Sequence, residues 1–485
     1  MSRQNNPHTT TTKMLIPQPP TSKLSGVPAQ SVGSQSLSRE RLIAELAVQR
    51  ASLVTKRVLS TLDLPPSSPI PSTPISPLGG GGSKTFSFFW SEQQQQQQQQ
   101  YGFPHPQQTT ANNGRRCSIA KPDASPVTIA DFAAQALLIS AIHSAFPKDA
   151  FVGEEDSASL RADPDLARQV WDLVSTTFLD EDPESERLLA RPRSMEEMFE
   201  VIDLGGSGSG SGGLRSEGGP GAAGVSTTRF WALDPIDGTS AFLKGQQYAV
   251  SLALIENGKE VLGVLGCPNL PVEVTVDGRM EEGRVSALVE PGSAENGNGN
   301  MGVMLSAVKG DGFATVREMG RGGLKPAKKI DRRRRGTGSN SGDESGPVKL
   351  RDLHFVDSSL SAATSSSKVR ELADMAGARY PGTEIYSSHM RYAAMVLGGR
   401  AHVQVRVPHN KRAAWCLWDH AGSQLIYTES GAGKVTDLHG REIDFGTGRK
   451  LSRNWGLITA DESVHAKVQA LVNELLSKDT KQLPN

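Results

Sequence analysis

Residues 231–239 read Trp-Ala-Leu-Asp-Pro-Ile-Asp-Gly-Thr, and this stretch decides how the chain is expected to fold. Its apolar beginning predicts a buried strand that ends in Asp234 and Asp237, two carboxylates three residues apart. Because Pro235 fixes φ between them, both side chains and the intervening carbonyl can point into one small volume. Hard cations bind such all-oxygen clusters, and the amides of the following Gly-Thr turn suit a phosphate oxygen. The stretch therefore predicts a metal-assisted phosphoester site.

Two other acidic stretches support this prediction. Residues 151–156 read Phe-Val-Gly-Glu-Glu-Asp, and Asp419 begins an apolar pattern that predicts a helix over residues 419–429. Four carboxylates brought close together would repel one another, by about 4 kcal/mol for one pair at about 4 Å and an effective dielectric constant of about 20. Either some of them are protonated or cations lie among them. Mg²⁺ is the natural occupant, because it takes oxygen ligands at about 2.0–2.1 Å.

The composition argues against several other classes of protein. The 485 residues carry 52 basic and 52 acidic side chains, so net charge gives no argument for binding nucleic acid or a membrane surface. No apolar run approaches the roughly 20 residues that span a bilayer. Three cysteines without a spacing motif favour a reducing cytosol. The first 39 residues lack acidic side chains, as a mitochondrial presequence does, but prolines interrupt any helix there, and we expect a disordered tail over residues 1–37.

Local patterns predict the elements of the remaining chain. Helical spacing predicts a helix over residues 38–62, and Thr128 with Asp131 predicts a capping box at the start of another. Asn257-Gly258 predicts a hairpin, and Ser387 or Ser388 predicts an N-cap. Helices first, hairpin strands in the middle and alternating elements at the end predict a layered α/β or α+β fold.

Residues 38–485 are interpreted as one phosphatase domain in two halves, a metal-binding and catalytic half (38–312) and a substrate half (348–485). Four segments poor in apolar residues are expected to be disordered insertions: 64–116, 205–226, 280–300 and 318–347. The first contains a tract of glutamines, and the last contains a basic run at residues 328–335. That run is read as a solvated loop, with a nuclear-localisation or polyanion-binding patch as the alternative.

Three motifs follow one another along the chain: Gly-Glu-Glu at residues 153–155, Asp-Pro-Ile-Asp-Gly-Thr at 234–239 and Trp-Asp-His-Ala-Gly at 418–422. Together they resemble the inositol monophosphatase superfamily of lithium-sensitive, Mg²⁺-dependent phosphatases. Residues 125–131 and 266–270 resemble its 3′(2′),5′-bisphosphate nucleotidase branch. The resemblance implies the alternating α-β-α-β-α sandwich of that family, with the metal site between its two halves.

The resemblance also implies roles for single residues. It assigns Glu154, Asp234 and the Ile236 carbonyl to one Mg²⁺ ion, and Asp234, Asp237 and Asp419 to a second, in a site of two or three ions. Asp123 would be the general base, with Thr239 as its hydroxyl partner. The substrate would be contacted by Gly238, Thr239, Ser388, Arg391, Arg406 and Asp419.

The activity implied is removal of the 3′-phosphate from adenosine 3′,5′-bisphosphate, and from 3′-phosphoadenylyl sulfate, in sulfate assimilation, with Li⁺ as an inhibitor. A small nucleotide would be the only partner, and a monomer is the default expectation. The chain departs from the family pattern at Arg391, where Lys is usual, and at residues 357–360, where a helix-leading His is replaced. Two alternatives stay open: an inositol phosphate phosphatase, and a non-catalytic interaction protein that uses the glutamine tract or the basic run.

Overall fold

The motif strand, β4 (Arg229–Asp237), lies second in a seven-stranded sheet. The computed structural model describes residues 37–62, 118–120, 126–206, 229–271, 301–334, 347–358, 363–410 and 413–481, all of which belong to one unit. The predicted insertions at 64–116 and 280–300 lie outside the described residues, as do residues 207–226, residues 335–346 and the tail before Leu37.

The seven-stranded sheet has the order β3-β4-β5-β6-β7-β8-β9. β3 and β4 are parallel, whereas the other neighbours are antiparallel. β5 and β6 form the predicted hairpin, in which Asn257 and Gly258 both have positive φ (51° and 75°), as a tight two-residue turn requires. The other strands are β3 (Ala150–Gly153), β5 (Ala249–Glu256), β6 (Lys259–Cys267), β7 (Val303–Val308), β8 (Ala314–Glu318) and β9 (Lys328–Ile330).

Helices cover one face of this sheet. α1 (Ser38–Leu59) packs on α3 (Ile129–Ala145), on β5, β6 and β7, and α3 packs on β4. α3 begins with the predicted capping box: Thr128 N and Oγ1 donate to the Asp131 carboxylate at 2.8 and 2.6 Å. Further out lie α4 (Ala158–Ala162), α5 (Pro164–Thr176), α6 (Pro183–Glu186) and α7 (Met195–Gly205), and a two-stranded ribbon of β1 (Ser118–Ala120) and β2 (Pro126–Thr128) precedes α3.

A second sheet of five strands, in the order β11-β10-β12-β14-β13, follows in the C-terminal part. Two helices, α9 and α12, bury their apolar residues against one of its faces, together with side chains such as Phe355 and Val403. The elements are η4 (Leu350–Asp352), β10 (His354–Asp357), α9 (Ser366–Ala376), β11 (Thr383–Glu384), β12 (His402–Arg406), β13 (Lys434–Thr436), β14 (Leu457–Ala460) and α12 (Glu462–Lys481).

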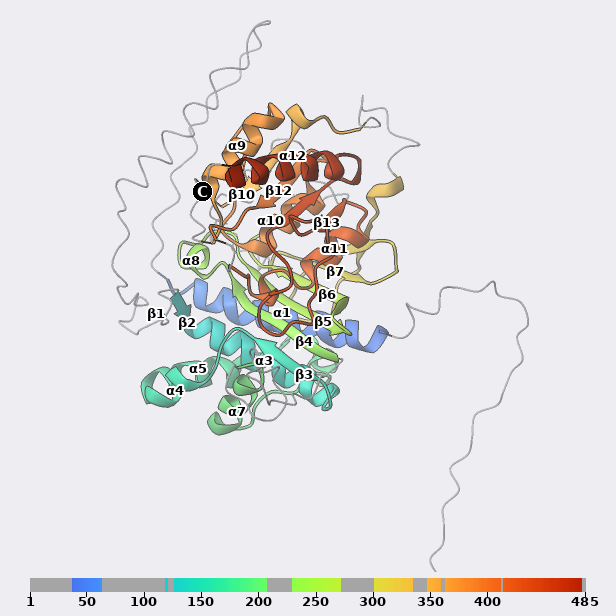
Figure 1. The fold of residues 1–485 in the computed structure, drawn as a ribbon. Helices are drawn as coiled ribbons and strands as arrows, with labels where there is room; N and C mark the ends of the chain where they lie inside the picture. The colour runs from blue at the N-terminus through green and yellow to red at the C-terminus, as the bar shows by residue number, and fades with distance from the viewer. Residues whose placement is uncertain are drawn as a thin grey trace, which may run out of the picture. The chain divides into compact units, whose positions relative to one another are not determined.

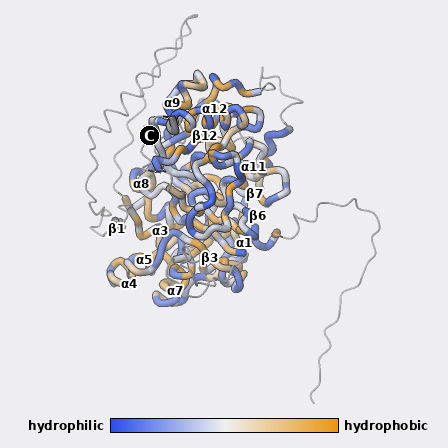
Figure 2. Tube along the Cα trace, viewed as in Figure 1, coloured by the Kyte–Doolittle hydropathy of each residue, from blue (hydrophilic) through white to orange (hydrophobic). Residues whose placement is uncertain are grey.

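Two helices lie between the sheets. α10 (Ser388–Leu397) and α11 (Ser423–Glu429) share one apolar cluster with residues of both sheets, among them Leu305 and Val356 (Figure 1). Apolar residues accordingly occur along helices and strands alike (Figure 2). The layers therefore alternate as α-β-α-β-α, and the predicted sandwich is confirmed. None of the helices in the described part of the chain is both long and apolar enough to span a membrane.

The predicted insertion at residues 318–347 is wrong for residues 318–334. Residues 328–330 form β9, which pairs with β8 so that Ile330 is buried while both lysines face solvent at the sheet edge. In the following turn, η3 (Arg332–Arg334), Arg332 is 7% exposed and donates from Nη1 to Met395 O at 2.6 Å. Charged residues protect an edge strand from pairing with other chains. Because most side chains of such an edge strand are charged and exposed, its sequence is hard to distinguish from that of a solvated loop.

The substitution Arg332→Met tests whether this run belongs to the core. The variant lacks the guanidinium that donates to the Met395 carbonyl near the end of α10. We therefore expect the free energy of unfolding to fall by about 2–3 kcal/mol. Urea unfolding followed by circular dichroism measures this, with the exposed Lys328→Met as the matched control. Equal stabilities of the two variants would restore the solvated-loop interpretation.

Candidate active site

A one-residue bulge in β4 brings Asp234 and Asp237 to the same side. In a regular strand, residues three apart face opposite sides of the sheet. Here Asp234 pairs with Ser251 and Asp237 pairs with Ala249, so the three steps on β4 match two on β5. The extra residue corrects the alternation. Both carboxylates are buried, with 2% and 6% exposure, at the end of the strand.

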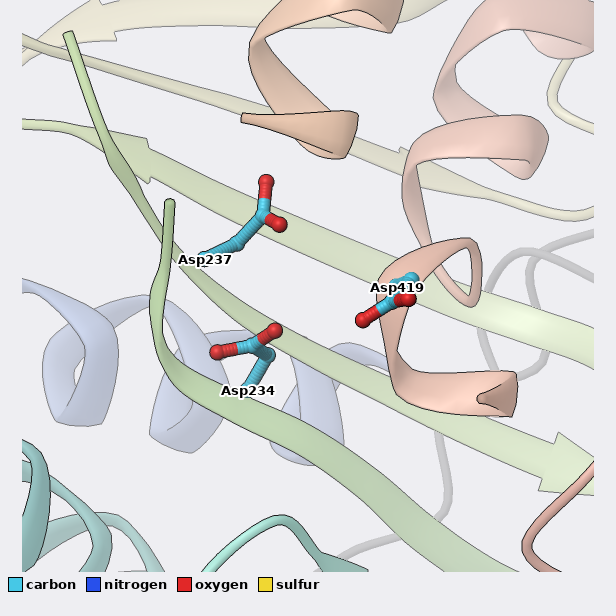
Figure 3. Close-up of side chains that lie close together, drawn as sticks. All are labelled: Asp234, Asp237 and Asp419. Carbon is cyan, nitrogen blue, oxygen red and sulfur yellow. The ribbon is translucent and has the colours of Figure 1, made fainter. Parts of the chain in front are cut away.

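Asp419 completes a cluster of three carboxylates. It lies in the turn η5 (Leu417–Asp419), which packs against β4. One carboxylate oxygen from each of Asp234, Asp237 and Asp419 lies within 4.8 Å of the other two (Figure 3). The prediction of a helix that begins at Asp419 is wrong, because α11 begins only at Ser423. The turn instead lets Asp419 face β4 before the chain enters the helix.

Glu154 lies next to this cluster. Gly153, the last residue of β3, pairs with Leu233, so the parallel register carries Glu154 and Asp234 to the same end of the sheet. The charge of Glu154 acts on both Asp234 and Asp419. Its carboxylate does not belong to the group whose oxygens lie within 4.8 Å of one another. The structure thus brings three of the four predicted acidic ligands together and the fourth beside them.

Two donors at the start of α10 hold Asp237. The Ser387 hydroxyl donates to Asp237 Oδ2, and His389 N donates to the same oxygen at 2.7 Å. Ser387 is also the N-cap of α10, since its hydroxyl accepts from Met390 N at 3.0 Å. Hydrogen bonds to an ionised group are stronger than neutral ones. The sequence predicts the N-cap from local preferences, but it does not indicate that the Ser387 hydroxyl binds Asp237, which is 150 residues away in the chain.

The cluster carries more negative charge than its surroundings offset. Burial, together with Glu154, Asp237 and Asp419, raises the pKa of Asp234 well above its ordinary value. Burial first, then Asp237 and Glu154, raises the pKa of Asp419 to about 7. Asp234 Oδ1 is buried without a hydrogen-bond partner among the described residues. An all-oxygen donor set with an unmatched buried carboxylate fits Mg²⁺ or a similar hard cation.

The turn after β4 has the conformation that the Gly-Thr pair predicts. Gly238 has φ of 89°, and a Cβ there would lie 2.9 Å from Ser387 Cβ, so only glycine lets this turn approach α10 so closely. Thr239 begins α8 (Thr239–Phe242), and its hydroxyl donates to Ile236 O at 3.1 Å. The predicted carbonyl ligand and the predicted hydroxyl partner are therefore in contact.

Two of the predicted substrate-binding residues, Ser388 and Arg391, are in direct contact. Arg391 Nη2 donates to Ser388 Oγ at 2.9 Å, and Arg391 Nη1 donates to the carbonyls of Ile385 and Tyr386 at 2.7 and 3.1 Å. The Arg406 guanidinium lies 4.9 Å from the Trp415 ring centroid. Both arginines are buried, with 2% and 5% exposure.

The two buried cations influence each other. Burial first, and then the positive charge of Arg391, lowers the pKa of Arg406 to about 10, while Asp419 opposes the shift. Burial likewise lowers the pKa of Arg391, and Asp237 and Asp357 oppose it. The charges of the two arginines and of the acidic cluster thus act on one another, through Asp237 and Asp419.

Two predicted features remain outside the site as described. Asp123, the predicted base, lies outside the described residues, as do Ser359 and Leu360. Asp357, at the start of that altered segment, is buried and accepts from Ser358 N at 2.7 Å and from the Tyr380 hydroxyl at 3.2 Å. The segment in which the family's helix-leading His is replaced therefore begins with a buried carboxylate.

The family model of the inositol monophosphatase family matches residues 203–478, which contain Asp234, Asp237 and Asp419. The chain belongs to the inositol monophosphatase family. A curated relative from Emericella nidulans, "3′(2′),5′-bisphosphate nucleotidase", is 32% identical over 443 residues, 91% of this chain and 99% of the relative. One of the same name from Schizosaccharomyces pombe is 33% identical over 370 residues, 75% of this chain and 88% of the relative.

A solved structure described as an IMPase/NADP phosphatase complexed with Mg²⁺ and phosphate is 14% identical, with a TM-score of 0.39, over 80% of this chain and 93% of that one. The resemblance to the family and to its bisphosphate nucleotidase branch is confirmed by the family match and the two curated relatives. Metal dependence is expected of this family, and the acidic cluster fits it.

The substitution Asp237→Asn tests the cluster as a metal site. We expect Mg²⁺ to raise the melting temperature of the wild-type protein but not of the variant, and turnover to fall at least about 100-fold because one ligand charge is lost. The metal-free melting temperature should change little, since the variant removes repulsion within the cluster but also weakens the hydrogen bonds from Ser387 and His389 N. Thermal unfolding with and without MgCl₂ measures this, with the exposed Asp172→Asn on α5 as control. Normal Mg²⁺ stabilisation of Asp237→Asn would exclude Asp237 as a ligand.

The raised pKa values predict how Mg²⁺ stabilisation depends on pH. Without a cation, the folded chain holds a proton on Asp419 up to about pH 7, whereas the unfolded chain loses it near the ordinary value of 3.8. The contribution of this group to stability therefore falls as the pH rises from about 4 to about 7. Because Mg²⁺ replaces the proton, the rise in melting temperature on adding MgCl₂ should grow across this window and then level off. A rise independent of pH, or one matched by NaCl of equal ionic strength, would contradict this.

Proposed function

We propose that this chain hydrolyses the 3′-phosphate of adenosine 3′,5′-bisphosphate to give AMP and phosphate, as a Mg²⁺-dependent 3′(2′),5′-bisphosphate nucleotidase. The observation that carries the proposal is the buried carboxylate cluster next to two buried arginines, in a chain that spans 99% of the Emericella nidulans relative. A phosphomonoester at the metal site and a second phosphate at the arginines match this distribution of charge. 3′-Phosphoadenylyl sulfate would be a second substrate, because it carries the same pair of anionic groups.

Each acidic residue has a role in this proposal. Asp234, Asp237 and Asp419 would hold one Mg²⁺ ion, and Asp234, Glu154 and the Ile236 carbonyl would hold another. Bound Mg²⁺ supplies positive charge to the phosphoryl group and activates water. The Ser387 hydroxyl and His389 N fix Asp237 in its orientation.

The turn at residues 238–239 receives the reacting phosphate. Gly238 lets the backbone approach the phosphate, and Thr239 holds its hydroxyl against Ile236 O, beside the metal ligands. In this proposal Asp123 takes the proton from the attacking water and Thr239 orients it. The role of Asp123 rests on the family resemblance alone.

The two arginines select the substrate. Buried cations need anionic partners; Asp237, Asp357 and Asp419 oppose the positive charge of the two arginines in the folded chain, and in this proposal a bound phosphate is a further partner. The Arg391 guanidinium is fixed by the carbonyls of Ile385 and Tyr386, so its planar donor group is oriented before substrate binds. We assign the 5′-phosphate to Arg391, Arg406 and Ser388. We also expect Li⁺ to inhibit by entering a cation position, and we place the activity in the cytosol, which suits the free thiols of Cys267 and Cys416.

Purified protein assayed with three phosphate esters tests this function. With Mg²⁺, kcat/KM for adenosine 3′,5′-bisphosphate should exceed that for 3′-AMP by about 100-fold, because each charge-assisted hydrogen bond to the 5′-phosphate contributes about 1.5–3 kcal/mol. Inositol 1,4-bisphosphate should be a poor substrate, and omission of Mg²⁺ should abolish turnover. Preference for the inositol ester would favour the inositol phosphatase alternative. Absence of Mg²⁺-dependent turnover of all three would favour a non-catalytic protein.

A further inference from the structure

Arg449 connects two backbone segments that meet beside the acidic cluster. It lies between β13 and β14, outside any helix or strand. Its Nη2 donates to Gly153 O at 2.7 Å, and its Nη1 donates to Gly205 O at 2.8 Å. Gly153 ends β3 directly before Glu154, and Gly205 ends α7. One guanidinium therefore binds the backbone on the N-terminal side of Glu154.

The two glycines are close enough for one guanidinium to bind both carbonyls. A Cβ on Gly205 would lie 3.0 Å from Gly153 N and 3.1 Å from Gly153 Cα, so the end of α7 approaches the end of β3 without room for a side chain. The planar donor group of arginine can satisfy two carbonyls at once, whereas the ammonium of lysine is a single point charge. The arrangement therefore suits the planar guanidinium of arginine better than the ammonium of lysine.

The same residue also supports Asp419. Arg449 O accepts from Leu417 N at 3.0 Å, at the first residue of the turn that carries Asp419. The neighbouring residues continue this contact, since Cys416 and Lys450 form an antiparallel bridge. The Arg449 guanidinium carbon lies 4.5 Å from the centroid of the Trp418 ring, next to Asp419. Backbone and side chain of one residue thus bind the segments that supply two separate acidic groups.

On its C-terminal side, Glu154 is held by a buried glutamine. Gln135 of α3 accepts from Glu155 N at 3.1 Å and donates to Glu155 O at 2.6 Å. Glu154 is therefore fixed between two backbone anchors, and Arg449 is the one that also reaches the Asp419 turn. Acidic side chains also surround Arg449. Burial lowers the pKa of its guanidinium, and the negative charges of Asp156, Glu154 and Glu155 oppose this shift.

We propose that Arg449 is a positioning residue for the metal site, which sets the distance between Glu154 and the Asp419 turn by binding Gly153 O, Gly205 O and Leu417 N. This rests on the proposed metal-binding role of the cluster. Without the guanidinium, the end of β3 loses its link to the Asp419 segment, and Glu154 no longer lies at a fixed distance from the other ligands. Groups that orient metal ligands typically change metal affinity by about 10–100-fold when they are removed.

Isothermal titration of the full-length protein with MgCl₂ tests the proposal, using Arg449→Met and Arg449→Lys. Arg453→Met is the matched control, since Arg453 lies in the same segment and makes an exposed ion pair with Asp444 at 2.8 Å. We expect Arg449→Met to weaken Mg²⁺ binding by about 10–100-fold. Arg449→Lys should recover only part of that loss, and the control should bind as the wild type does. Higher MgCl₂ should restore most of kcat in the Arg449 variants, because the groups that contact substrate are unchanged.

Three outcomes would overturn the proposal. Wild-type Mg²⁺ affinity in Arg449→Met, with or without a lower melting temperature, would give Arg449 a purely structural role. Full recovery by Arg449→Lys would mean that charge alone acts, not the two-carbonyl geometry, and this variant decides the matter if Arg449→Met does not fold. A kcat that stays low at saturating MgCl₂ would place the effect elsewhere. If the wild-type protein itself binds no Mg²⁺, the proposed function fails. If the wild type binds Mg²⁺ and the Arg449 variants bind it equally well, only the positioning role of Arg449 fails.

Discussion

Mutual repulsion among buried carboxylates is the constraint on which this structure depends. Asp234, Asp237 and Asp419 offer oxygens within 4.8 Å of one another, and the first two side chains are buried while Asp419 is half-buried. Such a group is tolerated only if hydrogen-bond donors, positive charges or a cation offset it. The surrounding elements supply the first two: the start of α10 donates to Asp237, and the positive charges of Arg391 and Arg406 act on Asp237 and Asp419. The raised pKa values of Asp234 and Asp419 indicate the charge that remains for a cation to balance.

The same constraint joins the two sheets. Asp234 and Asp237 belong to β4 of the seven-stranded sheet, whereas Asp419, Ser387 and His389 come from elements that follow β10 of the second sheet. The Asp237 carboxylate is therefore both a member of the acidic cluster and a hydrogen-bonding contact between the two parts. Gly238 makes this contact close, because any side chain there would collide with Ser387. The acidic cluster and the association of the two layers consequently depend on the same few residues.

The buried and half-buried arginines of this part of the structure make different kinds of contact. Arg391 and Arg406 are buried near the acidic cluster and would bind a second phosphate in the function proposed above. Arg449 binds backbone carbonyls behind Glu154 and beside Trp418. Arg332 is bound at the end of α10, far along the same helix whose start holds Asp237. The net charge of the chain is zero, and it therefore gives no indication that several arginine side chains have specific structural contacts.

The sequence by itself determined the features that depend on neighbouring residues. The apolar run before Asp234, the capping box of Thr128 and Asp131, the Asn257-Gly258 turn and the N-cap at Ser387 all follow from local preferences, and the structure contains each of them. The three motifs also predicted which carboxylates belong together, although only family resemblance connected residues so far apart.

Tertiary structure alone decided the rest, because those features depend on contacts between distant segments that no local pattern encodes. The bulge that aligns Asp234 with Asp237 is defined by pairing with β5. The turn that holds Asp419, mistaken for a helix start, is fixed by the backbone of Arg449. The basic run forms an edge strand because it pairs with β8. The Ser387 hydroxyl binds Asp237 because the end of β4 lies next to the start of α10. The sequence thus identified the candidate site residues, and packing set the distances between them.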